Sequence, residues 1–573
     1  MNKTNKYQDI FRFLAFCAIV VMVYFVSQFK AFRWDLTSEK RFSISETTKT
    51  LLKEIDDIVY IKVYLEGNEL PSEFNQLKRE TAILLDELKS QNENIEFEFI
   101  NPLASKDEKS KGEIMSQLSK KGLIPTTILI QEEDGVQEKV IVPGALLSYR
   151  GKEVSIQLLK SNIGSNPEEN LRESVNELEY EFMNAIRTAN SFIKPTIAFI
   201  TGHNELSKEE IEDFAIGLNE HFVISRFNLR EIPQDSITGE YLLRKKLSSL
   251  KKFQAIIIAK PRSSFSDLDK YFIDQYLMNG GKIMWLIDAV QAEMDSLSSR
   301  METMAFPMRE LGLEDQLFKY GVRINTDILT DITCAKIPLN IAEVNNQPQW
   351  QLMPWFYFPL IIPDSKHAIT NNLDAIQLTF ASSIDTIKTK GIKKTILLQT
   401  SPYTGKTNTP SRISLQSALS QPKQENFQAG RLTVAMLLEG KFSSLFKNRI
   451  KPNGDQNLPL IEDGKTSRMI VVSDGDIVRN AIKNGKPLPL GYDRYEKRQY
   501  ANKKFLLNAV DYLLEDNAVI NLRSRELKLR LLDKTKVNEE YNYWKAFNTI
   551  LPIMIVILFG IISIWMRRRR YAR

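Results

Sequence analysis

The sequence contains very little cysteine and histidine. Among 573 residues there are two cysteines, Cys17 and Cys334, and three histidines, His203, His221 and His367. Two cysteines this far apart exclude a disulfide scaffold, a CxxC redox pair and a cysteine-rich zinc site. Three histidines leave few candidates for the general base that a serine or cysteine hydrolase needs.

The signatures of nucleic-acid and nucleotide binding are also missing. The net charge is only +6, and no long basic stripe, zinc finger or RNA-reading motif occurs, so we expect no nucleic-acid partner. The segment "TSPYTGKT" (400–407) matches the second half of a phosphate-binding loop, but Thr400 replaces the first glycine and Pro410 opposes a following helix. We therefore expect no nucleotide hydrolysis, no cofactor and no bound metal.

Two long apolar runs are present, at residues 11–29 and 547–566. A helix needs about 20 apolar residues to cross a bilayer core of about 30 Å, so both runs are predicted to be transmembrane helices in contact with lipid. The first run is longer than a signal-peptide core and has no small-residue cleavage site after it. We expect it to remain as an uncleaved anchor.

The basic tail "RRRRYAR" follows the second run and sets the predicted orientation. By the positive-inside rule this tail, residues 567–573, lies in the cytoplasm. Two spans return the chain to the same side, so residues 1–10 are also predicted to be cytoplasmic. Residues 30–546 would then lie outside, in the periplasm if the membrane is the inner membrane of a Gram-negative cell.

The first part of this outer region, residues 36–165, has the pattern of a thioredoxin-like domain. A strand at 58–65, an amphipathic helix, a strand at 95–100 and three further strands at 124–130, 138–142 and 153–157 are predicted. Pro125 occupies the place of the cis-proline that precedes the third main strand of that fold. Because no cysteine lies between residues 18 and 333, the redox function of that fold is not expected.

The following region predicts an α/β domain. Continuous apolar strands at 196–200, 254–259 and 283–287 alternate with helical segments, which is typical of a parallel sheet covered on both faces. We assign residues 190–325 to the first part of this α/β domain and 461–522 to its second part. Residues 326–460, rich in Asn, Pro, Ser and Thr, are predicted to form a β-rich insertion, and 523–546 a juxtamembrane helix.

Four residues stand where an open α/β sheet usually binds ligands, just after its strands: His203, Pro261, Ser473 and Asp474. The segment "VVSDG" (471–475) is a degenerate nucleophile elbow, because Val471 replaces its first small residue. Two functions are possible for this segment. Ser473 could be a nucleophile assisted by His203, or Asp474 and Asp476 could bind magnesium. We expect a turn instead, with Asp476 starting a helix.

Four segments carry a resemblance to a known family: "RWDLTSEKRFSIS" (33–45), "TGHNEL" (201–206), "PRSSFSDLDKYFIDQYLMNGGKIMWLID" (261–288) and "VVSDGDIVRN" (471–480). With the two-span layout, they resemble the GldG family of gliding-motility proteins. The resemblance implies an auxiliary component of an ABC transporter, associated with a permease and a separate ATPase, with an amidotransferase-like domain and no established catalytic residues.

The leading prediction is therefore a non-enzymatic transporter subunit whose outer domains dock partners. Two alternatives remain open. One is a ligand-binding module that holds a sugar or peptide near His203, Pro261 and Asp474 beside the permease. The other is a membrane-anchored hydrolase that uses Ser473.

Overall fold

The computed structural model describes most of the chain. The described residues are 13–19, 21–22, 43–67, 70–104, 108–132, 135–159, 167–190, 194–234, 241–294, 296–297, 301–344, 347–363, 367–371, 373–419, 421–452, 458–514 and 540–571. Residues 13–19 and 21–22 are helical, and the rest of the first predicted span lies outside the described residues. Most of the predicted juxtamembrane helix also lies outside them.

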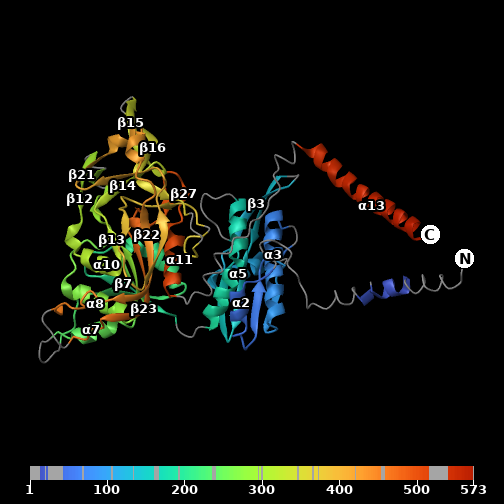
Figure 1. Ribbon diagram of the computed structural model, residues 1–573, viewed down its shortest axis with the longest axis horizontal. Helices are drawn as coiled ribbons and strands as arrows, with labels where there is room; N and C mark the ends of the chain where they lie inside the picture. The colour runs from blue at the N-terminus through green and yellow to red at the C-terminus, as the bar shows by residue number, and fades with distance from the viewer. Residues whose placement is uncertain are drawn as a thin grey trace. The chain divides into compact units, whose positions relative to one another are not determined.

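A four-stranded mixed sheet forms the core of the N-terminal part (Figure 1), in the order β2-β1-β5-β6. Strand β1 is parallel to β2 and antiparallel to β5, and β5 is antiparallel to β6. Its buried side chains pack with those of three helices. The bounds are α2 Glu46–Leu52, β1 Val59–Val63, α3 Ser72–Gln91, β2 Ile95–Phe99, β5 Gly144–Tyr149, β6 Lys152–Gln157 and α5 Pro167–Asn190.

The sequence pattern explains these elements. Val59, Ile61 and Val63 alternate with polar residues along β1 and are fully buried, as a strand covered on one face requires. Ser45 caps α2 by accepting a hydrogen bond from the amide of Thr48 at 3.0 Å.

Pro125 does not have the predicted role. The Ile124–Pro125 peptide is trans, and the strand after it, β3 (Thr126–Glu132), pairs only with β4 (Gly135–Ile141) in a separate hairpin. A helix, α4 (Glu108–Lys120), precedes this hairpin. The third strand of the main sheet is β5, so the prediction about Pro125 was wrong. The apolar pattern of 124–130 fits either a hairpin or a central strand, and periodicity cannot separate the two.

A seven-stranded sheet organises the larger α/β part, in the order β19-β22-β23-β10-β9-β7-β8. The five strands from β23 to β8 are parallel, β22 is antiparallel to β23, and the edge strand β19 is antiparallel to β22. The bounds are β7 Thr196–Thr201, β8 Val223–Asn228, β9 Ala255–Ala259, β10 Lys282–Leu286, β19 Ile392–Gln399, β22 Thr433–Ser443 and β23 Asp463–Val472.

Helices cover both faces of this sheet, which is why its central strands are continuously apolar. Alternate residues of a strand point to opposite faces. Ile257 of β9 packs with helices α6 (Glu212–Asn219) and α11 (Asn502–Leu514), while Ile256 and Ile258 pack on the other face with the set α7 Leu243–Leu250, α8 Asp267–Met278 and α10 Glu314–Tyr320. Ser207 and Glu210 form a capping box before α6, with hydrogen bonds of 2.8 Å and 3.3 Å.

The region 326–460 is rich in strands, as expected, but it is not separate from the main sheet, because β19 and β22 belong to that sheet. Its longest feature is the hairpin β15 (Cys334–Val344) and β16 (Gln347–Ile361). Short strands surround it: β11 Val290–Gln291, β12 Glu302–Pro307, β13 Val322–Ile324, β14 Asp327–Asp331, β17 Ile376–Gln377, β18 Ile384–Thr386, β20 Thr404–Asn408 and β21 Ser411–Ser414. Two small hairpins, β24 Ile482–Lys483 with β25 Lys486–Pro487 and β26 Tyr492–Asp493 with β27 Arg498–Gln499, lead into α11.

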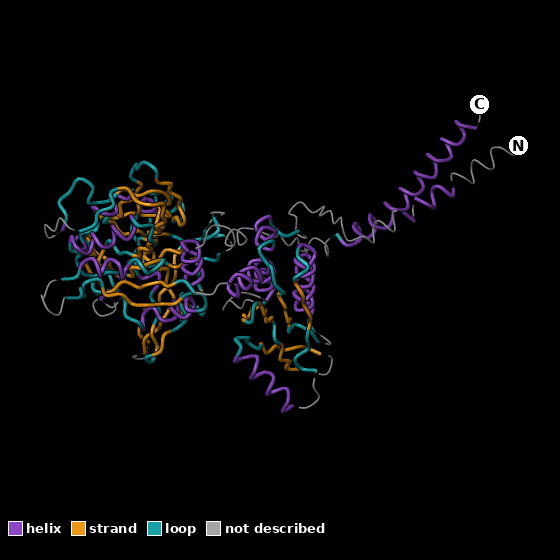
Figure 2. Tube along the Cα trace, turned by 90° about the horizontal axis from the view of Figure 1, so that it is seen from below, coloured by secondary structure: helices purple, strands orange, loops and turns teal. Residues whose placement is uncertain are grey.

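Near the C-terminus, α13 (Tyr541–Tyr571) is one unbroken helix (Figure 2), with Pro552 inside it. Its segment Tyr543–Met566 has 24 residues and a mean hydropathy of 2.5. At about 1.5 Å per residue, this length is sufficient to cross a bilayer. Within the described residues it is the one helix that is long and apolar enough, so the second predicted span is supported.

We predict that Asp274 of α8 is important for the stability of the α/β part. Its fully buried carboxylate accepts hydrogen bonds from the Tyr320 hydroxyl (2.9 Å), the Ser444 hydroxyl (2.6 Å) and the Leu445 amide (2.8 Å). Asp274→Ala should lower the free energy of unfolding by about 3 kcal/mol, because buried donors lose their acceptor. Denaturant titration of the full chain in detergent measures this change.

The control Asp267→Ala, in an exposed position of the same helix, should cost less than about 1 kcal/mol. Equal losses would contradict the prediction.

Candidate functional site

The candidate site lies at the edge of the sheet where the parallel strands end. Strands β7, β9, β10 and β23 are parallel, so their carboxyl ends meet at one edge. Each strand is followed by a polar loop that carries charged or hydroxyl side chains. These are His203 and Glu205 after β7, Lys260 after β9, Asp288 after β10, and Ser473, Asp474 and Asp476 after β23.

Lys260 is at the centre of the first group of side chains. It is 2% exposed, and its ammonium group lies 2.5 Å from Asp476 Oδ2 and 3.1 Å from Asp288 Oδ2. Burial alone lowers the pKa of a lysine, but the negative charges of Asp288 and Asp476 outweigh that effect and raise the pKa of Lys260. The amine is therefore held in its charged form and is not available as a nucleophile or base.

The backbone shapes this contact. Lys260 adopts a left-handed conformation with φ of +52°, which is uncommon for a residue with a side chain. A Cβ atom on Gly475 would lie 2.7 Å from Cβ of Lys260, so only glycine allows the two loops to approach this closely. The amide of Gly475 donates to Asp288 Oδ1 at 2.5 Å. The loops after β9, β10 and β23 are thus joined at one point.

Asp474, in the same cluster, accepts hydrogen bonds from backbone amides. Its carboxylate accepts the amide of Thr379 at 2.7 Å and the amide of Asp476 at 2.8 Å. Burial raises the pKa of Asp474 well above its ordinary value, and the charges of Asp288 and Asp476 raise it further. Burial also raises the pKa of Asp288. Proton uptake by these carboxylates relieves their mutual repulsion.

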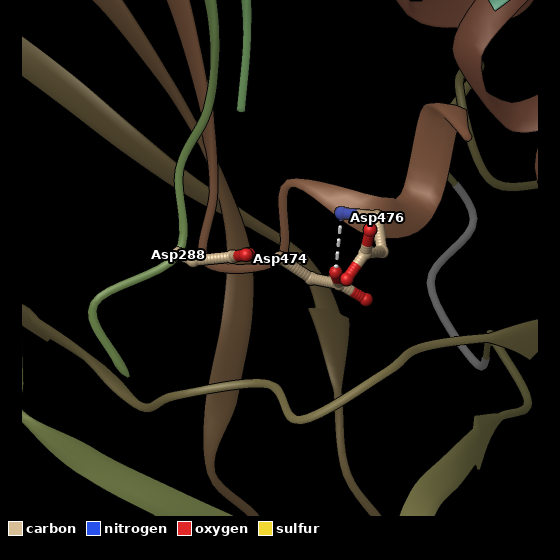
Figure 3. A group of neighbouring side chains, drawn as sticks. All are labelled: Asp288, Asp474 and Asp476. Atoms are coloured by element: carbon tan, nitrogen blue, oxygen red, sulfur yellow. Dashed lines mark hydrogen bonds between the residues drawn. The ribbon is translucent and has the colours of Figure 1, made fainter. Parts of the chain in front are cut away.

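The three aspartates have the arrangement of a metal-binding group (Figure 3). One oxygen from each of Asp288, Asp474 and Asp476 lies within 4.8 Å of the others. Asp288 comes from the end of β10, and the other two come from the turn after β23. However, Lys260 already supplies a cation to two of these carboxylates, and backbone amides occupy Asp474. Lys260 and the backbone amides therefore offset part of the cost of burying these carboxylates.

The turn after β23 corrects one expectation. Asp474 and Gly475 form the predicted turn, but Asp476–Val478 is a single 3-10 turn rather than the start of an α-helix. The next helix, α11, begins at Asn502. Two ion pairs hold this short turn in place. Asp476 pairs with Lys260, and Arg479 pairs with Glu210 at 3.0 Å.

His203 is at the centre of a second group. Its ring is fully buried and stacks on Phe265, with 3.7 Å between the ring centres. Nδ1 lies 3.1 Å from Glu205 Oε1, and Nε2 lies 3.2 Å from Asp269 Oδ2. The second contact is within ion-pair range, but its angle is not that of a good hydrogen bond, so Nε2 has no hydrogen-bond partner within the described residues.

The charges around the imidazole favour its protonated form. Burial lowers the pKa of His203, but Asp269 and Glu205 raise it, and the net effect is a pKa above the ordinary value. Asp269 is also the third residue of a capping box with Ser266 at the start of α8, and Arg230 lies 3.8 Å from its carboxylate. His203 therefore links the loop after β7 to the start of α8. A base for a hydrolase would need the neutral form.

The predicted site residues are only partly brought together. The amides of Arg262 and Ser263, which follow buried Pro261, donate to the carbonyl of His203 at 2.8 Å and 3.0 Å, so Pro261 is close to His203. The Ser473 hydroxyl instead donates to the carbonyls of Ser382 (2.5 Å) and Val434 (3.1 Å). Within the described residues no hydrogen bond or ion pair joins Ser473 or Asp474 to a histidine.

Sequence reasoning missed Lys260, Asp288, Glu205 and Asp269. A usable signal existed for two of them. Lys260 directly follows the apolar strand "AIIIA" and Asp288 follows "MWLI", which are the same positions that drew attention to His203 and Asp474. The capping pattern Ser266–Asp269 was visible in the sequence, but its second partner, His203, was not.

A cleft lies away from the carboxyl ends of the parallel strands. It has a volume of about 980 Å³ and lies between α10, β13, β14 and β20. None of the four predicted site residues lines it. Its charged lining residues are Glu314, Asp315, Lys319, Arg323, Asp327, Lys406 and Arg449. Three of the four cations already have acidic partners: Arg323 with Asp385, Lys406 with Asp327, and Arg449 with Asp315.

Comparison with known proteins identifies the family. The family described as "ABC-type uncharacterized transport system" matches residues 194–509, which is more than half of the chain. The chain belongs to this family. A family of unknown function, DUF7088, matches residues 38–148.

Individual relatives add little about function. An uncharacterized protein of Borreliella burgdorferi is 21% identical over 582 residues, covering 99% of each chain. The solved mmIFT52 N-terminal domain covers 56% of this chain and 98% of its own, with 11% identity and a TM-score of 0.29. That score is too low to support an argument about fold or function.

We predict that the ion cluster stabilises the fold strongly. Lys260→Met should lower the free energy of unfolding by about 3–5 kcal/mol, because Asp288 and Asp476 are left buried without their cation. The matched control is Lys447→Met, which removes an exposed pair with Asp463 and should lower the free energy of unfolding far less. Denaturant titration measures both free energies of unfolding. A decrease for Lys260→Met as small as that of the control would contradict a stabilising role of the ion cluster.

We predict that His203 makes stability depend on pH. An imidazole with a raised folded-state pKa adds stability that is fully present below its unfolded pKa, about 6.5, and is lost as the pH rises through the folded pKa. The stability advantage of wild type over His203→Gln should therefore shrink as the pH rises above about 6.5. Thermal unfolding across this range measures it.

His367 provides the control with the opposite sign. Burial lowers its pKa, so its contribution should be lost as the pH falls rather than as it rises. A flat profile for His203→Gln relative to wild type would contradict a charged His203.

Proposed function

We propose that this protein is a non-catalytic accessory subunit of a bacterial ABC transporter. Membership of the transport family carries the proposal, because this match covers the α/β part that contains the candidate site. In this proposal the chain associates with a permease and a separate ATPase, and the resemblance to GldG adds a role in gliding motility. Its own residues would contribute binding surfaces rather than chemistry.

The membrane helix supports this role. The segment Tyr543–Met566 is exposed along its length and has the hydropathy of a transmembrane helix. Trp565 lies near its end, with the guanidinium of Arg569 4.2 Å from its ring centre. An aromatic residue next to arginines is typical of the membrane interface on the cytoplasmic side. In the proposed topology, two spans place residues 30–546 in the periplasm of the inner membrane.

The geometry of the strand ends also supports a non-catalytic role. Lys260 is charged and paired, the pKa of His203 is raised, and the Ser473 hydroxyl donates to backbone carbonyls. A serine nucleophile requires a neutral base within hydrogen-bond reach and a donor site for an oxyanion. In the described residues the polar groups of this edge instead hold loops of the same chain together.

We predict that the full chain, purified in mild detergent from its own cells, retains a permease and an ATPase. Ser473→Ala should keep both partners and the transporter-dependent phenotype, because its hydroxyl only supports the backbone. Mass spectrometry of the purified complex and a phenotype assay measure these results. Recovery of a lone chain would contradict the accessory role, and loss of the phenotype with intact assembly would favour the hydrolase.

The cleft favours a second candidate function, a ligand-binding module beside the permease. It combines exposed Phe318 with polar and charged side chains, a lining that suits a sugar or a peptide. Because a ligand that binds only the folded state raises stability, thermal unfolding with envelope glycans and peptides tests this function. A shift that Phe318→Ser removes would support it.

A further inference from the structure

The hairpin of β15 and β16 leaves part of its length without cover. We call residues 338–344 and 347–354 the arm. Figure 1 shows both strands extending together from one end of the α/β part. Residues 340–342 and 348–352 are all exposed, whereas Trp355 on the same strand is fully buried. At the base of the arm Leu339 is buried and Met353 packs against the same core, so the exposed part of the arm begins beyond these two residues.

One face of the arm is apolar. Trp350 pairs with Asn340, and Leu352 pairs with Pro338. Because alternate residues share a face, the side chains of Trp350, Leu352 and Pro338 lie on the same side of the hairpin. Trp350 is 64% exposed and Leu352 is 37% exposed. A large aromatic and an aliphatic side chain exposed together are typical of a contact surface.

The arm lacks the charges that usually protect a strand edge. Of all chain residues 26% are charged, but Glu343 is the one charged residue between Ile337 and Ile361. Natural edge strands commonly carry lysine or other charges, which prevent pairing with a second strand. An uncharged surface accepts an uncharged partner, and two copies of the arm bring few like charges together.

The outer edge of β16 is free to pair. Within the described part of the chain, β16 pairs on that side with β17 at Leu360 and Ile361, and the amides of Leu378 and Phe380 donate to the carbonyls of Pro359 and Tyr357. No backbone hydrogen bond to residues 349–353 is described on that side. Residues 349–353 lie between Pro348 and Pro354, so every backbone N–H of this stretch is present. The outer edge of β15 is less suitable, because a bulge near Ile341 interrupts its register.

These features decide the type of occupant. A lipid bilayer would accept the tryptophan and leucine, but it could not satisfy the open backbone edge, which does not occur in the hydrocarbon region. A protein strand satisfies both the edge and the apolar face. The occupant that matches the arm in charge, length and apolar surface is another arm.

We propose that the arm pairs with the arm of a second copy of this chain. The two β16 strands run antiparallel about a two-fold axis at Gln351, so that Gln351 faces its own counterpart. Trp350 of each copy then pairs with Leu352 of the other, and all four side chains lie on the same face. A four-stranded sheet results, in which Trp350 of each copy contacts Leu352 of the other. This contact is independent of the permease and the ATPase.

The first test is the mass of the purified full chain in detergent, measured by light scattering from about 1 µM to about 100 µM. Wild type should form a dimer with rising concentration. Trp350→Lys with Leu352→Lys should remain a monomer, because four lysines would meet across the interface. The control Ile362→Lys with Ile450→Lys, at exposed positions outside the arm, should dimerise like wild type. Circular dichroism confirms folding of both variants.

The second test fixes the register. In a chain with Cys17→Ser and Cys334→Ser, the change Gln351→Cys should give an intermolecular disulfide, because directly opposite residues lie about 4.5–5.5 Å apart. A wild-type monomer over the whole concentration range, or a dimer that survives both lysines in the arm, overturns the proposal. A dimer in which Gln351→Cys does not cross-link overturns the pairing about Gln351.

Discussion

The ammonium group of Lys260 lies between the carboxylates of Asp288 and Asp476, and the rest of the strand-end edge depends on this contact. The three residues follow β9, β10 and β23, which are distant in sequence but adjacent in the sheet. Removing a charge from water is costly, so a buried lysine is stable only when its charge is compensated. The amides of Gly475, Asp476 and Thr379 complete the compensation by donating to the aspartates.

Because of this contact, the polar side chains at the strand ends bind one another. In many α/β proteins the carboxyl ends of parallel strands hold a ligand or a cofactor. Here the same positions bind one another: Lys260 with two aspartates, and His203 with Glu205 and Asp269. Groups held in this way add rigidity to the loops. The proposed accessory role draws on this arrangement together with membership of the transport family.

Local patterns in the sequence predicted the elements well, and contacts between distant loops poorly. The apolar run at 254–259 and the Ser207–Glu210 capping box were readable because helix and strand periods and caps depend on nearby residues. The antiparallel strands β19 and β22 were assigned to an insertion, since their place in the sheet depends on long-range pairing. Among the site residues, His203, Pro261, Ser473 and Asp474 were correctly placed after apolar strands. Lys260 and Asp288 were missed because a buried ion pair is defined by tertiary packing.

The central claim is that Lys260 is the cation of the strand-end cluster and that no exchangeable ion belongs there. The most direct measurement is calorimetric titration of the full chain in detergent with Mg²⁺ and Mn²⁺. We expect no saturable site that depends on Asp288, Asp474 or Asp476, because the Lys260 ammonium pairs with Asp288 and Asp476, and backbone amides donate to Asp288 and Asp474. Stoichiometric binding that disappears in Asp474→Asn would contradict it and would make the cluster a metal centre.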